Sequence, residues 1–192
     1  MKQLFLAIAL LSAAVQFGYA QTQWHVSGAG NDAADGKSPS MAFRSLKKAA
    51  AAVQPGDVVL IGNGDYTDED KGDGSAVVNL STSGRPNAWI TWKAAPGAKP
   101  VVRPAGWCGI EITASYNILD GLTVAGANDS LVLLHAQMEA KNKTPDPKYN
   151  SNGIFFNGRN RKPDEKPHHL IIRNCTVNDC PGGGIVGIEM DY

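Results

Sequence analysis

The sequence has 192 residues and a net charge of zero, with 21 glycines, 11 prolines and only 7% aromatic residues. Abundant glycine and proline favour a fold with many turns over a helix bundle. The balanced charge lacks the basic excess of a typical nucleic-acid-binding protein, so we expect no nucleic-acid partner. Basic residues do outnumber acidic ones between residues 141 and 173. Such a local zone can attract a polyanion, although a solvated loop without a partner explains it equally well.

Residues 1–20 have the pattern of a secretory signal peptide. Lys2 precedes an apolar run at residues 4–15, and the segment ends in Gly-Tyr-Ala, which places small residues at the positions that a signal peptidase requires. The run is shorter than the roughly 20 apolar residues that span a membrane. We therefore predict a secreted or periplasmic protein with a mature domain at residues 21–192 and no membrane span.

The mature sequence begins with a short strand, expected at residues 24–27, and a turn-rich segment leads from it to a helix at residues 45–53. Ser45 or Ser40 is the expected N-cap, and the helix must end before Pro55. Its apolar residues follow the i, i+3, i+4, i+7 spacing of one helix face. These residues are Leu46, Ala49, Ala50 and Val53.

Beyond this helix the helical period disappears, and we expect only strands joined by turns. Residues 58–61 form a continuous β-rich run, and residues 89–93 alternate between apolar and polar positions. Trp89 and Trp92 are three residues apart on the second of these strands, so they should point to opposite faces and at least one should be in the core.

Two segments of nine residues repeat the same pattern. Residues 116–124 align with residues 169–177, and each contains two inward positions, a bend at Gly121 or Asn174, and two further inward positions.

A second repeated element is a strand that starts with Gly-Ile, at Gly109, Gly153 and Gly184. Together the two elements give a coil of about 22 residues. The interval from Gly109 to Gly153 is 44 residues, which corresponds to two coils unless one coil carries a long loop. The interval from Gly153 to Gly184 is 31 residues, and we assign its surplus of nine to a charged loop at residues 159–167.

A strand-only repeat of this length is typical of a solenoid in which stacked coils form parallel sheets around an apolar interior. A leucine-rich repeat would need a fixed leucine pattern that this sequence lacks. An ordinary β-sandwich would not repeat its own pattern in this way. The helix at residues 45–53 then caps the open apolar end of the first coil.

Four segments carry a resemblance to a known family. Residues 24–49 (W-H-V-S-G-A-G-N-D, continuing to the helix), 54–67 (Q-P-G-D-V-V-L-I-G-N-G-D-Y-T), 84–97 (G-R-P-N-A-W-I-T-W-K-A-A-P-G) and 168–192 resemble the cap and coils of exported proteins of the pectin-lyase-like superfamily. The resemblance implies an all-β fold, a right-handed parallel β-helix with a short N-terminal capping helix.

The resemblance also implies an activity, because characterised members of this superfamily are mostly polysaccharide lyases that act on uronate polymers. We therefore expect an exported protein that binds an acidic polysaccharide and cleaves it by β-elimination, in which a cation neutralises the uronate carboxylate and a base removes the C5 proton. The closely spaced aspartates of pectate lyases are not found in the sequence. A non-enzymatic surface or adhesion module remains an alternative. A glycoside hydrolase, which needs two carboxylates about 5–9.5 Å apart, is another.

The residues expected to act on the polymer are in or beside the charged loop, because loops that project from stacked coils form binding grooves. Arg161, Lys162 and His168 are the candidate catalytic residues, and His169 and Arg159 are the candidate substrate-binding residues. A solvated charged loop would explain the same residues without any site.

A calcium ion is the expected cofactor, since calcium-dependent members of the superfamily hold the ion with Asp and Glu oxygens. The candidate ligands are Asp179, Glu189 and Asp191, near bends of the last coils. Scattered carboxylates that only solvate the surface are the alternative.

Three cysteines, Cys108, Cys175 and Cys180, leave at least one thiol unpaired within the chain, and no pair has the spacing of metal ligands. Cys175 is interpreted as a small buried hydrophobic residue. The sequence stops at Tyr192 partway through a coil and has no C-terminal cap. We therefore expect a monomeric N-terminal fragment of a longer β-helix, with catalytic coils beyond Tyr192.

Overall fold

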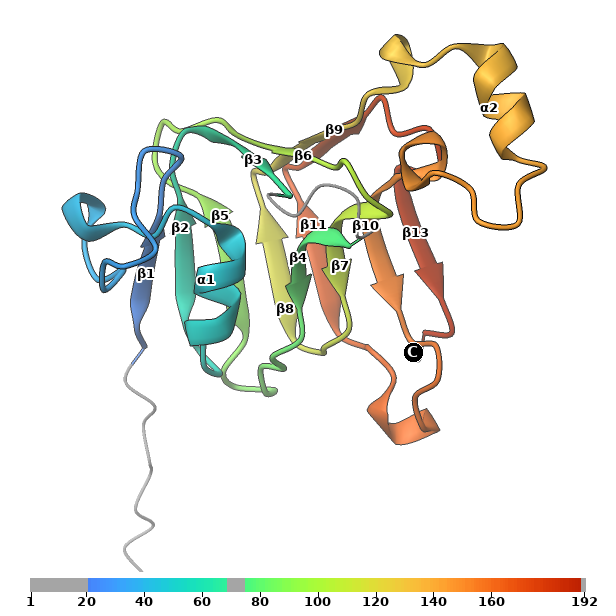
Figure 1. Ribbon diagram of the computed structural model, residues 1–192. Helices are drawn as coiled ribbons and strands as arrows, with labels where there is room; N and C mark the ends of the chain where they lie inside the picture. The colour runs from blue at the N-terminus through green and yellow to red at the C-terminus, as the bar shows by residue number, and fades with distance from the viewer. Residues whose placement is uncertain (1–20, 69–74, 191–192) are drawn as a thin grey trace, which may run out of the picture.

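In the computed structural model, which describes residues 21–68 and 75–190, the strands are arranged in three parallel sheets around one apolar core (Figure 1). From β2 onward, successive strands of the chain join sheet A, sheet B and sheet C in turn. Strands of successive coils pair in parallel within each sheet. This arrangement is a parallel β-helix, and the predicted fold is confirmed. The predicted signal peptide, residues 1–20, lies outside the described residues.

Each sheet contains one strand from each coil. Sheet A consists of β1 (Gln23–Val26), β2 (Val58–Ile61), β5 (Ile90–Ala94), β8 (Asn117–Asp120) and β11 (Leu170–Arg173). Sheet B consists of β3 (Gly64–Thr67), β6 (Pro100–Arg103), β9 (Thr123–Ala125) and β12 (Thr176–Asn178). Sheet C consists of β4 (Ala76–Leu80), β7 (Cys108–Ile112), β10 (Asn152–Asn157) and β13 (Ile185–Ile188).

Apolar residues of successive coils stack in register to form the core. In sheet A, Val59 pairs with Trp92, and Trp92 pairs with Leu119; all three are buried. Trp92 therefore takes the core position expected for one of the two tryptophans. Its indole Nε1 donates a hydrogen bond of 3.1 Å to Oδ1 of the buried Asn117, so the one polar atom of the ring is satisfied inside the core.

The Gly-Ile motif is explained by a close approach between sheets B and C. A Cβ atom added at Gly109 would lie 2.8 Å from Val124, and one added at Gly153 would lie 2.4 Å from Val177. The residue that follows, Ile110 or Ile154, is buried in sheet C. The chain thus needs glycine where each of these two coils enters sheet C, because the valine of sheet B occupies the space that a side chain would take.

The predicted bends between sheets A and B are also confirmed. Gly121 and Asn174 follow paired residues of β8 and β11 and have φ angles of 74° and 54°. Glycine and asparagine are the residues that adopt this left-handed conformation most readily.

The predicted capping helix is α1 (Leu46–Ala52), and its N-cap is Ser45, whose Oγ accepts a hydrogen bond of 3.1 Å from the Lys48 backbone N–H. Leu46 and Ala49 are buried and join the core cluster. The helix contacts β1 and β4, so it closes the core beside the first coil, as predicted.

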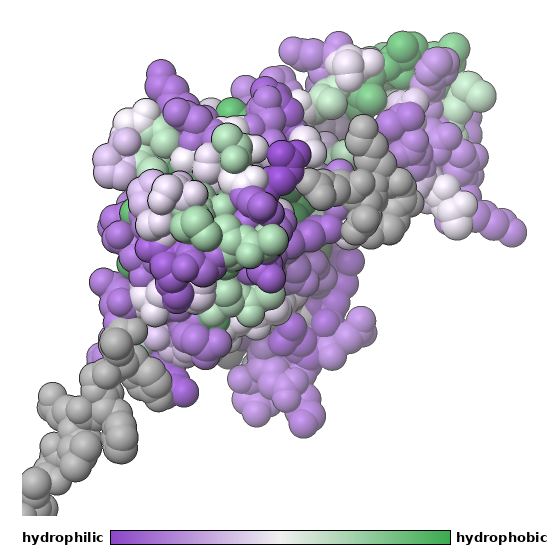
Figure 2. Space-filling model, turned by 60° about the vertical axis from the view of Figure 1, so that its left-hand side comes forward, coloured by the Kyte–Doolittle hydropathy of each residue, from purple (hydrophilic) through white to green (hydrophobic). Residues whose placement is uncertain are grey.

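The segment between β9 and β10 corrects the expectation of strands alone. Ile110 pairs directly with Ile154, so the 44 residues from Gly109 to Gly153 are one coil with a long insert rather than two coils. The insert contains η2 (Asn128–Ser130), α2 (Leu133–Glu139) and η3 (Pro147–Asn150). Its apolar side chains face outward (green at the upper right of Figure 2). None of the residues of α2 is buried, and this helix was not predicted from the sequence.

The charged loop between β10 and β11 is confirmed as an insertion, and it contains only η4 (Pro163–Glu165). Cys108, Cys175 and Cys180 are all free thiols; Cys108 is buried, and Cys175 packs against the core from a half-buried position. In the part of the chain that the structure describes, no helix has the length and apolar character needed to cross a membrane.

Polar contacts on the outer faces tie the coils together. Asp120 on β8 accepts hydrogen bonds from Arg173 Nε (3.0 Å) and from Asn174 Nδ2 (2.8 Å), which belong to the next coil. On sheet B, Arg103 Nε donates a hydrogen bond of 2.8 Å to Asp65 Oδ1. The hydrogen bond from Asn174, together with Arg173, holds the pKa of the Asp120 carboxyl below its ordinary value of 3.8.

We predict that Gly153→Ala destabilises the protein by about 1–3 kcal/mol, the usual range for overpacking a core. Gly184→Ala is the matched control, because it belongs to the same motif and its added Cβ would have no neighbour closer than 3.7 Å. The free energies of unfolding would be measured by urea denaturation. Equal losses in the two variants would contradict the packing explanation.

We predict that Asp120→Asn lowers the melting temperature by about 1–4 °C at pH 7, the range for an exposed ion pair. Because the folded-state pKa is lowered, this stabilisation is complete above the unfolded value and is lost as the pH falls through the folded value. The gap between wild type and variant should therefore close below about pH 3.8. Thermal melts at several pH values measure it, with Asp164→Asn on the exposed loop as the control; a gap that does not change with pH would count against this account.

Candidate functional site

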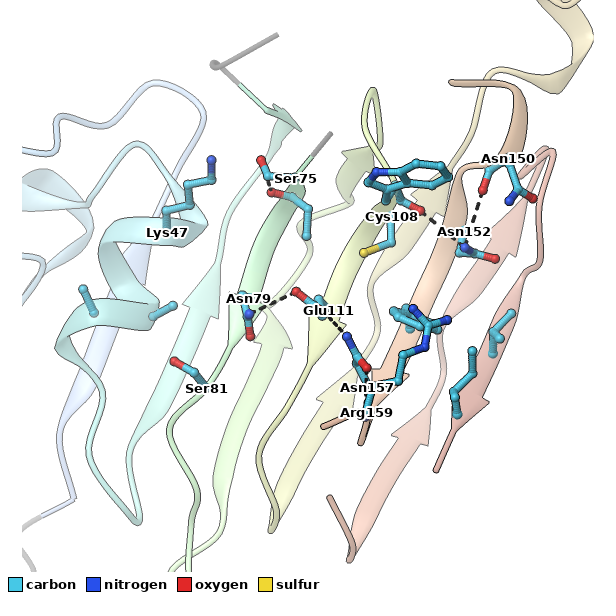
Figure 3. A pocket seen from close by; sticks show the side chains of 17 residues that line it. Lys47, Ser75, Asn79, Ser81, Cys108, Glu111, Asn150, Asn152, Asn157 and Arg159 are labelled. Carbon is cyan, nitrogen blue, oxygen red and sulfur yellow. Dashed lines mark hydrogen bonds between the residues drawn. The ribbon is translucent and has the colours of Figure 1, made fainter. Parts of the chain in front are cut away.

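The outer face of sheet C forms the floor of a groove with a volume of about 840 Å³ (Figure 3). Strands β4, β7, β10 and β13 all contribute to the floor, and α1 borders it through Lys47, Ala50 and Ala51. The capping helix therefore forms one side of the groove.

The register of the coils aligns the side chains of the floor into rows. Asn79 pairs with Glu111, Glu111 pairs with Phe155, and Phe155 pairs with Val186. Asn79, Glu111 and Phe155 are each next to a buried residue, so the alternation of a β-strand turns them outward, and Val186 continues the row by pairing with Phe155. The row is polar on the first two coils and apolar on the next two.

Glu111 is at the centre of a hydrogen-bond network that spans three coils. Asn79 Nδ2 donates to Glu111 Oε2 at 3.0 Å, and Asn157 Nδ2 donates to Oε1 at 2.8 Å (Figure 3). Thr113 Oγ1 donates in turn to Asn79 Oδ1 at 3.0 Å. Both carboxylate oxygens are therefore held by amides, and the carboxylate has a fixed position in the floor.

Aromatic and cationic side chains lie near the same network. Trp107, just before β7, is 41% exposed and lines the groove. Arg159, two residues after β10, lies with its guanidinium carbon 5.3 Å from the centre of the Phe155 ring. The Arg159 backbone N–H donates to Asn157 Oδ1 at 3.1 Å, which links this cation to the Glu111 network.

Lys47 and Ser75, which line the helix side of the groove, both contact a buried carboxylate. Asp68 has a side-chain exposure of 3%, and its Oδ1 lies 2.8 Å from Lys47 Nζ. Ser75 Oγ also donates a hydrogen bond to Asp68. A buried carboxylate needs such compensation, so we assign Lys47 and Ser75 first to the stability of this wall.

The groove thus offers amide donors and acceptors, one fixed carboxylate, exposed rings and a cation. Amides can pair with hydroxyl groups both as donors and as acceptors. Exposed rings add apolar faces beside them. This combination suits a polyhydroxylated ligand, which has both polar edges and apolar faces.

Of the five residues expected from the sequence to act on a substrate, Arg159 lines the groove. Arg161 and Lys162 are on the loop before η4, and Lys162 is 77% exposed, with its Nζ 3.8 Å from Glu165. His168 and His169 lie at the corner that leads into β11, in contact with each other. The structure therefore does not bring the five residues together in the groove.

The candidate calcium ligands are also separated along the fold. Asp179 follows β12 of sheet B, whereas Glu189 follows β13 of sheet C and lies 3.8 Å from Lys166; Asp191 lies outside the described residues. Within residues 21–68 and 75–190, no three His, Cys, Asp or Glu side chains form a group that could hold a metal. The calcium site and the metal dependence therefore stay predictions.

Sequence reasoning missed Glu111, Asn79 and Asn157, whereas Trp107 is one of three tryptophans, with Trp89 and Trp92, that could be expected to stack on sugar rings. Glu111 could have been identified, because it follows the Gly-Ile motif at an outward position. Asn79 could not have been identified, because β4 has valine where the later coils have the glycine of this motif. The sequence therefore does not reveal how β4 pairs with β7.

Cys108 also lines the groove, and we predict that it is unreactive. Burial raises the pKa of its thiol to about 12, and the charge of Glu111 acts in the same direction. The thiolate, which is the reactive form, is then only about one part in ten thousand at pH 8. Iodoacetamide labelling followed by mass spectrometry should show slow modification of Cys108 in the native protein and fast modification in urea. Fast native labelling at Cys108 would contradict the burial described here.

No protein-family model matches the chain, and no curated protein matches it either. Among solved structures, a GH136 lacto-N-biosidase from Eubacterium ramulus aligns with a TM-score of 0.60 and 18% identity over 84% of this chain and 28% of that protein. A rhamnogalacturonan lyase aligns with a TM-score of 0.48 and 21% identity over 55% of this chain and 29% of its own. Pectate lyase Pel9A aligns with a TM-score of 0.45 and 25% identity over 57% and 32%. The chain thus spans less than a third of each of these proteins, and the likeness to the lacto-N-biosidase establishes the parallel β-helix fold.

Proposed function

We propose that the protein binds an acidic polysaccharide in the groove on the outer face of sheet C and cleaves it by β-elimination. The observation that carries this proposal is the hydrogen-bond network of Asn79, Glu111 and Asn157, which lies in the same groove as Trp107 and Arg159. The solved structures that share the fold include proteins described as lyases and as a glycosidase. These likenesses agree with a carbohydrate ligand but do not indicate which carbohydrate it is.

The shape of the groove favours a polymer over a single sugar. Four strands about 4.8 Å apart give a floor about 14 Å wide across the coils. Amides from different coils, such as Asn79 and Asn157, offer hydrogen bonds at separate points along that distance. A chain of sugars crossing the coils would therefore contact several of them at once.

Arg159 is the reason to expect an acidic polymer. It is exposed, and its guanidinium lies over the Phe155 ring, which limits the orientations of its planar face. A guanidinium in a defined orientation binds a carboxylate through two parallel hydrogen bonds. By contrast, Lys47 at the helix side already lies 2.8 Å from the Asp68 carboxylate, so Arg159 is the better partner for a uronate.

In the proposed reaction, Arg159 neutralises the uronate carboxylate and so makes the C5 proton more acidic. A base takes that proton, the C4–O4 bond breaks, and a C4=C5 double bond forms. The departing O4 oxygen receives a proton, which balances the reaction. The fixed Glu111 carboxylate and its amides position the sugar that carries the reacting carbon.

We predict that Arg159→Gln weakens binding of pectate, alginate or a glycosaminoglycan by at least tenfold in Kd. The substitution removes the cation but keeps the backbone N–H that contacts Asn157. Lys162→Gln is the matched control, because it removes one positive charge from the exposed loop outside the groove. Calorimetry and affinity electrophoresis would measure binding, with neutral xylan as the comparison polymer. Equal loss in both variants would show a nonspecific charge effect and contradict the assignment of Arg159.

The reaction is tested by following the ultraviolet absorbance of the unsaturated uronate, with calcium and with chelator. A rising signal would support elimination, and its loss with chelator would place a metal in the mechanism. New reducing ends without this absorbance would indicate hydrolysis. Binding without either signal would indicate a binding module, and the absence of both binding and cleavage on every acidic polymer would overturn the proposal.

A further inference from the structure

Two adjacent histidines at the corner before β11 form a second cluster, separate from the groove. The Nδ1 atoms of His168 and His169 lie 2.6 Å apart. Neither histidine lines the groove. Two imidazole nitrogens this close share a proton, so that one donates and the other accepts.

The surrounding fold holds the two rings in defined orientations. Tyr116 stacks on His169 with ring centres 4.7 Å apart and an interplanar angle of 24°. The same tyrosine meets His168 at 5.2 Å and 87°, edge to face. Trp89 packs at a right angle against Tyr116, so aromatic residues of the two preceding coils support the pair.

Backbone contacts fix the chain at this corner as well. The His168 N–H donates to Ser115 Oγ at 3.1 Å, and the Tyr116 N–H donates to the His168 carbonyl at 3.2 Å. His169 has a left-handed φ of 52°, and Tyr116 at the equivalent position of the preceding coil has a φ of 57°. A left-handed backbone is unfavourable for tyrosine and histidine unless the surrounding structure imposes it. Contacts with the preceding coil therefore fix the backbone at this corner, and the backbone in turn positions the two imidazoles.

We propose that His168 and His169 form a binding site for a divalent transition-metal ion, Cu²⁺ in preference to Zn²⁺. When both Nδ1 atoms lack a proton, their lone pairs can converge on one ion. With metal–nitrogen bonds of about 2.0–2.1 Å, the 2.6 Å separation corresponds to an N–metal–N angle of about 80°. This angle is close to the right angle between neighbouring ligands of tetragonal Cu²⁺ and far from the tetrahedral angle that Zn²⁺ prefers.

The order of affinities points the same way, because imidazole sites bind Cu²⁺ more tightly than the other divalent ions of the first row. Within the described residues, no third His, Cys, Asp or Glu joins the pair. In the proposed site, water would complete the coordination of the ion. Because Tyr116 preorganises the two imidazole rings, they lose less conformational freedom when the metal binds than free side chains would.

The test uses the full-length chain without an affinity tag, titrated calorimetrically with Cu²⁺ and separately with Zn²⁺. We expect one strong Cu²⁺ site per chain and at least tenfold weaker Zn²⁺ binding. His169→Ala and His168→Ala should each raise the Kd for Cu²⁺ at least tenfold. His135→Ala, on the exposed helix α2, is the control and should leave it unchanged. The electron paramagnetic resonance spectrum of the Cu²⁺ complex should show two coordinated imidazole nitrogens.

Retention of the strong Cu²⁺ site in the His168→Ala and His169→Ala variants, with circular dichroism confirming their folds, would overturn the proposal. Absence of a strong Cu²⁺ site in the wild type would also overturn it, leaving only a hydrogen bond between the two rings. Tighter binding of Zn²⁺ than of Cu²⁺ would contradict the geometric argument. These outcomes do not depend on polysaccharide binding, so this site and the groove are tested independently.

Discussion

The in-register stacking of one coil on the next is the constraint on which the other features of this structure depend. Each coil must place an apolar residue above the apolar residue of the coil before it, as Val59, Trp92 and Leu119 do in sheet A. The two coils that contain β7 and β10 must also leave out a side chain where sheets B and C approach, at Gly109 and Gly153. Because the hydrophobic contribution grows with the area removed from water, a slip of one residue would turn the core positions toward solvent.

The same register that builds the core also arranges the groove. If Ile110 faces inward, then Glu111 must face outward, directly beside Asn79 of the preceding coil. Side chains at outward positions do not pack in the core, so the residue type at these positions can differ from coil to coil. Sheet C uses this freedom to place a carboxylate between amides of two neighbouring coils, and α1 gives that face a wall. The candidate site is therefore a consequence of how the solenoid is capped and stacked.

The repeated features of the fold could be predicted from the sequence because repetition is visible along the chain. The bends at Gly121 and Asn174, the Gly-Ile strands and the helix capped by Ser45 all have local signals, and the structure confirms them. Helix α2 of the insert was not predicted; none of its residues is buried, so packing against the core does not impose the spacing of a helix face on its sequence. The candidate site was missed for a different reason: its residues come from different coils, and their proximity appears only when the register of β4 is known. The charge of the loop led to the prediction of Arg161 and Lys162 as catalytic residues. Of the cations of this loop, all of them among the described residues, Arg159 lines the groove.

The most direct test of the central claim, that the outer face of sheet C is the carbohydrate site, is a nuclear magnetic resonance titration with a uronate oligosaccharide. The side-chain amide signals of Asn79 and Asn157 and the indole signal of Trp107 should shift together as ligand is added. The amide signals of Asn63 and Asn178, which belong to the sheet B side of the solenoid, should stay unchanged. Shifts at Asn63 and Asn178 without shifts at Asn79 and Asn157 would place the ligand on another face and contradict this account.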